Sequence, residues 1–114
     1  MKILIVEDNI SMYENIARAV SASGTEITYC SSSSEALAAF EAQRPDIVIM
    51  DIRIKPLNGI KTTKMLKELY PKTKIIMLTS HDEPEYHEAA RQAGASAYVL
   101  KDNLAQLRKL INVI

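Results

Sequence analysis

The chain has 114 residues, of which 47% are hydrophobic and 25% charged, and this length and composition fit one globular domain and argue against two. Fourteen basic and fourteen acidic residues cancel, so the chain as a whole is not drawn to nucleic acid or to an anionic membrane, and any DNA binding belongs to another domain. The single cysteine, Cys30, fits a reducing compartment, and no segment resembles a signal peptide or reaches membrane-spanning length. We therefore expect one cytoplasmic domain over residues 1–114.

The first part of the chain predicts a strand, a helix and an edge strand. Lys2–Val6 is rich in apolar residues without polar alternation, as in a strand that is buried on both faces. Ser11 and Glu14 have the spacing of a capping box and predict a helix that stops near Gly24. The mixed segment Glu26–Cys30 predicts a weaker strand, which is better suited to the edge of a sheet.

The middle of the chain predicts the central strand between two helices. Ser32 and Glu35 fit a second capping box, and Pro45 ends the helix that they begin. In residues 46–51, four consecutive apolar residues are closed by a carboxylate, which predicts a strand in the middle of a helix-covered sheet. Asn58-Gly59 precedes a third helix of clear 3.6-residue period, which Pro71 closes.

The last third predicts two more pairs of strand and helix. Lys74–Leu78 is a fourth apolar strand, and Asp82 is expected to cap a helix that ends at Gly94. A short strand over residues 97–100 follows. Asp102 is then expected to cap the final helix, whose apolar stripe consists of Leu104, Leu107, Ile111 and Ile114.

Five strands that alternate with five helices predict an α/β fold, a doubly wound parallel sheet of the flavodoxin-like type with strand order 2-1-3-4-5. Ligands of such sheets bind at the carboxyl ends of the strands, and polar residues follow four of the strands here. Each alone has an ordinary explanation as a helix-start acid, a loop residue, a turn or a surface charge. Their joint placement predicts a site built from Glu7, Asp8, Asp51, Thr79 and Lys101.

Over nearly all its length the chain resembles the receiver domain of two-component response regulators. The resemblance rests on an acidic pair after the first strand, an aspartate after the third, a glycine eight positions later, a threonine and a small residue after the fourth, and a tyrosine three positions before a lysine: Glu7-Asp8, Asp51, Gly59, Thr79-Ser80, Tyr98 and Lys101. Residues 93–102 look most like the NarL-type branch.

The resemblance implies a phosphorylation-dependent signalling switch, not an enzyme acting on other molecules. Asp51 would accept a phosphoryl group from a phosphohistidine of a sensor histidine kinase or phosphotransfer protein. Mg²⁺ (or Mn²⁺) would be held by Asp51, Asp8, Glu7 through water, and the backbone carbonyl of Arg53. Lys101 would contact the phosphoryl group and, without metal, would pair with Asp51.

The resemblance also implies how the signal spreads. Thr79 would move to hydrogen-bond a phosphoryl oxygen, and Tyr98 would follow inward. The readout would be the face of the fourth helix, fifth strand and fifth helix, and its output would be transcription, through a DNA-binding domain separate from this chain. Arg53 and His81 occupy positions that tune the rates of phosphate gain and loss, and we expect Arg53 to contact or shield the phosphoryl group. Homodimers through the helix 4 to helix 5 face or through helices 1 and 5 are common in the family.

Some features depart from the family pattern or leave alternatives open. Many receivers have Met-Pro where this chain has Ile54-Lys55, with Pro56 one place late, so the resemblance does not determine the path of the loop that carries Arg53.

A flavodoxin-like electron carrier is disfavoured by the acidic pair, and an aspartyl phosphatase by the arginine at position 53. The remaining alternative is a pseudo-receiver, a protein-interaction module that is not phosphorylated. A metal site at His81 and His87 is disfavoured by their spacing, and both side chains are expected to be solvated.

Overall fold

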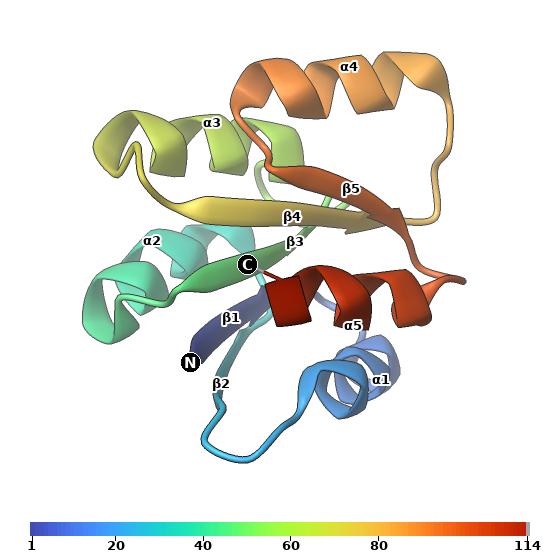
Figure 1. Ribbon diagram of the computed structural model, residues 1–114. Coiled ribbons are helices and arrows are strands. Elements are labelled where there is room, and N and C mark those ends of the chain that lie inside the picture. The colour runs from blue at the N-terminus through green and yellow to red at the C-terminus, as the bar shows by residue number, and fades with distance from the viewer. Residues whose placement is uncertain (114) are drawn as a thin grey trace.

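The computed structural model describes residues 1–113, and over this range five strands alternate with five helices (Figure 1). Their bounds are β1 Lys2–Val6, α1 Ile10–Val20, β2 Glu26–Cys30, α2 Ser33–Gln43, β3 Ile47–Asp51, α3 Gly59–Leu69, β4 Lys74–Thr79, α4 Pro84–Ala93, β5 Ala97–Leu100 and α5 Leu104–Val113. No helix within these 113 residues has the length and apolar character that crossing a membrane requires.

The five strands form one parallel sheet in the order β2-β1-β3-β4-β5, which confirms the predicted topology. The weak strand β2 lies at an edge, as its mixed composition predicted. The order reverses between β1 and β3, so a crevice is expected where the chain leaves these two strands at their carboxyl ends. In the register, Val6 lies opposite Met50, and Asp51 lies opposite Leu78. The last residues of β1, β3 and β4 are therefore nearly level.

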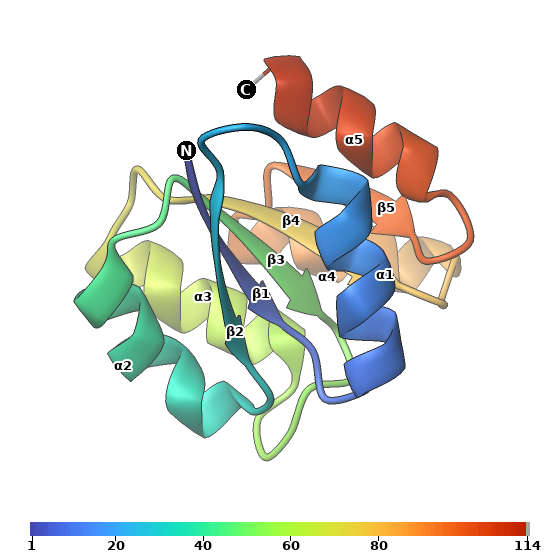
Figure 2. The same ribbon diagram turned by 90° about the horizontal axis from the view of Figure 1, so that it is seen from below.

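Helices cover both faces of the sheet (Figure 2), and an apolar core lies beneath them on each face. Successive residues of β3 point alternately to the two faces, so Ile47 and Ile49 pack in the core beneath α1 and α5, while Val48 and Met50 pack in the core beneath α2, α3 and α4. All four side chains are buried. An unbroken apolar strand is thus required because both of its faces are covered.

The sequence predicted a capping residue for four of the helices. One of these predictions was right and three were wrong. Ser32 accepts a hydrogen bond from Glu35 N at 3.3 Å and caps α2 as expected. The capping box of Ser11 and Glu14 was wrong, because α1 begins two residues earlier and the side chain of Asn9 accepts from Met12 N. Asparagine caps helices as well as serine does, so the earlier residue prevails.

The caps predicted at Asp82 and Asp102 were also wrong. Helix α4 starts at Pro84, and the residue at its cap position, Glu83, makes no side-chain capping bond. Proline favours the first helical position because its ring fixes φ and it lacks an N–H, so the helix starts there without a side-chain cap. At α5, Asn103 Oδ1 accepts from Gln106 N at 3.3 Å, one residue after the aspartate.

The ends of the helices agree with the sequence at Gly94 and differ at Gly24. Gly94 terminates α4 with a φ of 104°, which only glycine adopts easily. Helix α1 ends at Val20, and Gly24 lies in the turn into β2. In α5, Leu107 and Ile111 are buried and Leu104 packs against the same core, whereas the fourth predicted residue of the stripe, Ile114, lies outside the described residues.

Candidate functional site

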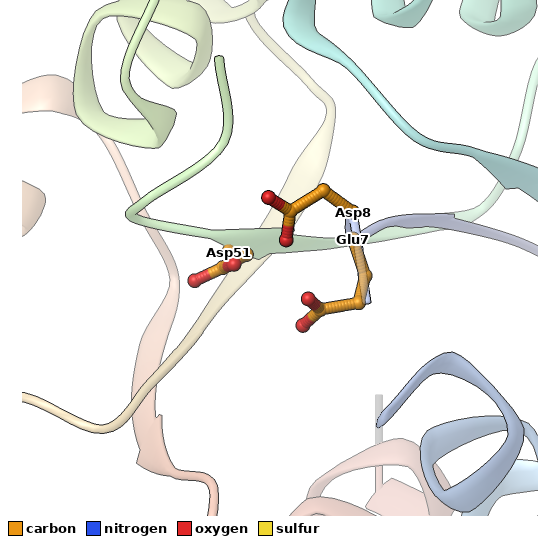
Figure 3. Close-up of side chains that lie close together, drawn as sticks. All are labelled: Glu7, Asp8 and Asp51. Carbon is orange, nitrogen blue, oxygen red and sulfur yellow. The ribbon is translucent and has the colours of Figure 1, made fainter. Parts of the chain in front are cut away.

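Three carboxylates meet where β1 and β3 end. Glu7 and Asp8 follow β1 directly, and Asp51 is the last residue of β3. One oxygen from each side chain lies within 4.8 Å of the other two, and Figure 3 shows the three groups converging. Glu7 and Asp51 are 1% and 3% exposed, whereas Asp8 is open to solvent. The predicted crowding of these residues at the switch point is therefore correct.

Lys101 brings a cation to this cluster from the end of β5. Its Nζ lies 2.9 Å from Glu7 Oε1 and 3.4 Å from Asp51 Oδ2. The predicted pairing with Asp51 is present, but the contact with Glu7 is shorter. Glu7 Oε1 and the ammonium therefore form a largely buried ion pair. The other oxygen, Oε2, accepts from Asn9 N at 3.1 Å.

Burial and mutual charge shift the pKa values of this cluster. Burial raises the pKa of Glu7 above its ordinary 4.5, the Lys101 ion pair opposes this rise, and the charge of Asp51 adds to it. Burial lowers the pKa of Lys101, but Glu7 and Asp51 outweigh that effect, and the pKa lies above 10.5. Lys101 is therefore charged at neutral pH and acts as an internal counter-ion for the acidic residues.

The loop after β3 is bonded to Asp51 at its start. Arg53 N donates to Asp51 Oδ1 at 3.2 Å, and the side chain of Arg53 is exposed. Gly59, at the start of α3, lies against the same residue, because a Cβ atom there would be 2.1 Å from the Asp51 backbone oxygen. Glycine is thus needed at position 59 because it lets the start of α3 approach the backbone of Asp51 closely. The Lys55–Pro56 peptide bond in this loop is cis.

Thr79, His81 and Tyr98 form a second group beside the cluster. Thr79 is the fully buried last residue of β4, and its Oγ1 accepts from His81 N at 3.1 Å. The hydroxyl of the half-buried Tyr98 donates to the backbone oxygen of His81 at 2.6 Å. Burial, with the charges of Glu83 and Asp82, raises the pKa of Tyr98 to about 12. The two predicted switch residues, Thr79 and Tyr98, are therefore both hydrogen-bonded to His81, in the loop of residues 80–83.

Each of the two histidine rings packs against a tyrosine ring. His87 stacks on Tyr98 with ring centroids 3.8 Å apart, and its Nε2 lies 2.8 Å from Asp82 Oδ1. His81 packs on Tyr86 with centroids 5.0 Å apart. The expected exposure holds for His87, whose side chain is 44% exposed, whereas the side chain of His81 is 24% exposed and thus only partly solvated. The tyrosine that covers His87 comes from β5.

Carboxylate oxygens from three residues make this a suitable place for a hard divalent cation. Mg²⁺ and Mn²⁺ prefer oxygen ligands, and Mg²⁺ tends to keep several waters, which suits a cluster open on the side of Asp8. Among the described ion pairs the three carboxylates share a single ammonium, that of Lys101, so the cluster keeps excess negative charge that a divalent cation would balance. The sequence did not identify Asn9 as part of this site. Its backbone N–H holds Glu7, and such backbone contacts leave no trace in residue type.

Comparison with known proteins gives a consistent result. The family model of the response regulator receiver domain matches residues 3–112. The transcriptional regulatory protein YhcZ of Bacillus subtilis, described as uncharacterized, is 44% identical over 68 residues, covering 60% of this chain and 32% of the relative. The probable transcriptional regulatory protein TcrX of Mycobacterium tuberculosis is 31% identical over 99 residues, covering 87% of this chain and 42% of the relative. This chain thus spans about a third to a half of the length of such relatives.

Solved structures agree with this assignment. A LuxR-family two-component response regulator from Aurantimonas sp. SI85-9A1 has a TM-score of 0.91 and 27% identity, and the match covers 98% of this chain and 82% of that one. The chemotaxis protein CheY4 of Vibrio cholerae has a TM-score of 0.89 and 28% identity, and the match covers 99% and 97% of the two chains. The chain therefore belongs to the response regulator receiver domains of two-component systems, as the resemblance in its sequence indicated.

Proposed function

We propose that this receiver domain is a phosphorylation-dependent switch in which Asp51 accepts a phosphoryl group from a phosphohistidine on a sensor histidine kinase or phosphotransfer protein. The observation that carries the proposal is the joint position of Asp51 with two acidic neighbours and Lys101 at one edge of the sheet. A buried carboxylate flanked by both a cation-binding set and a fixed ammonium is the arrangement that transfer of an anionic group requires.

The transfer is a displacement at phosphorus. An Asp51 carboxylate oxygen attacks the phosphorus atom, the P–N bond of the phosphohistidine breaks, and its electron pair leaves with the imidazole, which takes up a proton. Asp8, Asp51, Glu7 through water and the Arg53 carbonyl would hold Mg²⁺ or Mn²⁺. When bound, the ion neutralises negative charge on the phosphoryl oxygens. Lys101 lies close enough to Asp51 for its ammonium to contact a phosphoryl oxygen after transfer.

Thr79 and Tyr98 would convert this local change into a change of surface. Because Thr79 Oγ1 accepts a hydrogen bond from His81 N, the hydroxyl proton of Thr79 is left to donate to a phosphoryl oxygen. A movement of Thr79 would pull on His81, whose carbonyl holds the Tyr98 hydroxyl. The surface of α4, β5 and α5 would then change, because phosphorylation adds charge and acceptor oxygens to a two-state element.

The wider setting is also part of the proposal. We expect transcriptional output through a DNA-binding domain outside these 114 residues, since YhcZ and TcrX are named as transcriptional regulators and are longer than this chain. The same reasoning favours a cytoplasmic protein that meets its kinase there and that can form homodimers. We expect no enzymatic activity beyond its own phosphorylation and dephosphorylation.

Intact-mass measurement after incubation with Mg²⁺ and acetyl phosphate tests the proposal directly. The wild-type chain should gain the mass of one phosphoryl group, and Asp51→Ala should gain none. Asp46→Asn is the matched control, because this aspartate precedes β3 at the opposite end of the strand and should leave labelling intact. Chelation of the metal should abolish labelling. A wild-type chain that stays unlabelled with every donor would instead support the pseudo-receiver.

A further inference from the structure

The loop between β3 and α3, residues 52–58, is fastened to the first residue of α2. Ser33 N donates to Lys55 O at 2.8 Å, and Leu57 N donates to Ser33 Oγ at 2.8 Å. Ser33 is 3% exposed, whereas the two loop residues that it bonds, Lys55 and Leu57, are exposed. A buried serine thus holds the exposed second half of the loop at two points.

The first half of this loop is bonded to the end of β3 and to the start of α3. Ile54 N donates to Asp51 O at 3.4 Å, and Gly59 N, at the start of α3, donates to Ile52 O at 2.7 Å. Ile52 and Ile54 are both buried in the core beneath α2, α3 and α4. Arg53 lies between these two buried isoleucines and shortly before the residue that Ser33 holds. The position of its backbone therefore depends on anchors from the strand, the core and α2.

We propose that Ser33 is a positioning residue that fixes the loop carrying Arg53 and so sets the affinity of the acidic cluster for a divalent cation. The inference rests on the proposed function, in which the Arg53 carbonyl is one of the ligands. Ser33 itself does not touch the cation. Its effect is to limit the conformations of the loop, because a ligand that is already ordered loses less entropy when the ion binds.

Removal of the Ser33 hydroxyl would leave Leu57 N without its acceptor and would release the second half of the loop. The backbone bond from Ser33 N to Lys55 O would remain, so the loop should loosen and not detach. A purely structural role would lower the stability of the fold equally with and without metal. A positioning role lowers the stability more when the metal is present, because the variant gains less from binding it.

The test is calorimetric titration of the full chain with MgCl₂, for wild type, Ser33→Ala and Ser33→Thr. Ser34→Ala is the matched control, because this neighbouring serine is exposed and its hydroxyl faces Ser32, not the loop. We expect the Kd of Ser33→Ala for Mg²⁺ to rise by about 3- to 10-fold, the range that loss of one hydrogen bond corresponds to. Ser33→Thr keeps a hydroxyl and should restore part of the affinity. Amide exchange of Leu57 should accelerate in Ser33→Ala alone.

Each outcome decides the inference. If Ser33→Ala binds Mg²⁺ as tightly as wild type, the proposal is overturned and Ser33 has only a structural role, while the proposed function stands. If the wild type itself does not bind Mg²⁺, both the inference and the metal-dependent function fail. If Ser33→Ala does not fold, Ser33→Cys takes its place, because a thiol is close to serine in size but is a weak acceptor. The same rise in Kd is then required.

Discussion

Lys101 lies closer to Glu7 than to the aspartate that it was expected to pair with, at 2.9 Å against 3.4 Å. Glu7 is almost completely buried and has no other cation among its described neighbours, so this ion pair offsets the cost of burying its charge. Without metal, the ammonium of Lys101 therefore supplies the positive charge that a divalent ion would supply when bound. The two cations act on the same carboxylates.

Replacement of Lys101 by methionine should make the fold depend on metal. Lys101→Met keeps most of the side-chain length but leaves Glu7 and Asp51 without a counter-ion. We expect it to lower the free energy of unfolding by about 2 kcal/mol in the presence of chelator. This loss is smaller than that for breaking a fully buried ion pair, because the lysine is partly exposed. Excess Mg²⁺ should restore much of that loss. Urea unfolding with and without Mg²⁺ measures both effects. Lys109→Met on the exposed side of α5 is the control, and equal midpoints for the two variants in chelator would contradict the prediction.

A methyl group at position 59 should disturb both the fold and the phosphoacceptor. The Cβ atom of Gly59→Ala would meet the Asp51 backbone oxygen at 2.1 Å, so the start of α3 must move away from β3. We expect a loss of about 3 kcal/mol, at the upper end of overpacking effects. Gly24→Ala is the comparison, because Gly24 has a φ of 83° and open space, and should lose only about 1 kcal/mol from backbone strain. Urea unfolding that shows equal losses would refute the clash.

Tyr98 should titrate well above the ordinary pKa of a tyrosine. Its pKa is raised to about 12 by burial and by Glu83 and Asp82, so the folded state favours the neutral phenol. The stability that this preference provides is fully present below the ordinary pKa of 10 and is lost as the pH rises through 12. Phenolate absorbance should show one ionisation near pH 12 that Tyr98→Phe lacks. If the variant instead lost an ionisation near pH 10, Tyr98 would not be buried as described.

Arg53 should lengthen the life of the phosphorylated state. Its backbone N–H is bonded to Asp51 and its side chain is exposed, so the guanidinium is free to turn toward the anionic product and to contact or shield it. We expect Arg53→Ala to shorten the phosphate half-life by about 2- to 5-fold, in keeping with a solvent-exposed charge contact. Lys55→Ala, another exposed cation of the same loop, controls for net charge. An unchanged half-life, followed by intact mass over time, would show that Arg53 does not protect the phosphoryl group.

The fold and the centre of the site were predictable because their signals are strong and independent. Unbroken apolar runs such as residues 47–50 identify strands that are covered on both faces. Once the strands are parallel, their carboxyl ends must meet at one edge, which brings Asp51 and Lys101 together without further information. Sequence separation then matters little, because the topology determines which residues are neighbours.

Details that depend on competition between nearby groups were not predictable. At α1 and α5, the residue singled out in the sequence gave way to an asparagine within two positions, because several side chains there can cap equally well, as Asn9 and Asn103 show. At α4, Pro84 sets the start of the helix without a side-chain cap. The bond that links Ser33 to Leu57 spans 24 residues and joins a helix to a loop, so no local pattern reveals it. The stacking of His87 on Tyr98 likewise depends on packing between α4 and β5.

The placement of Lys101 at the end of the last strand has a consequence for a chain that is still being synthesised. Domains generally fold as units, and Lys101 leaves the ribosome well after Glu7, Asp8 and Asp51. The acidic cluster can therefore assemble together with its counter-ion only once the last strand has been made. That strand both completes the sheet and relieves the repulsion among the three carboxylates that the sheet brings together.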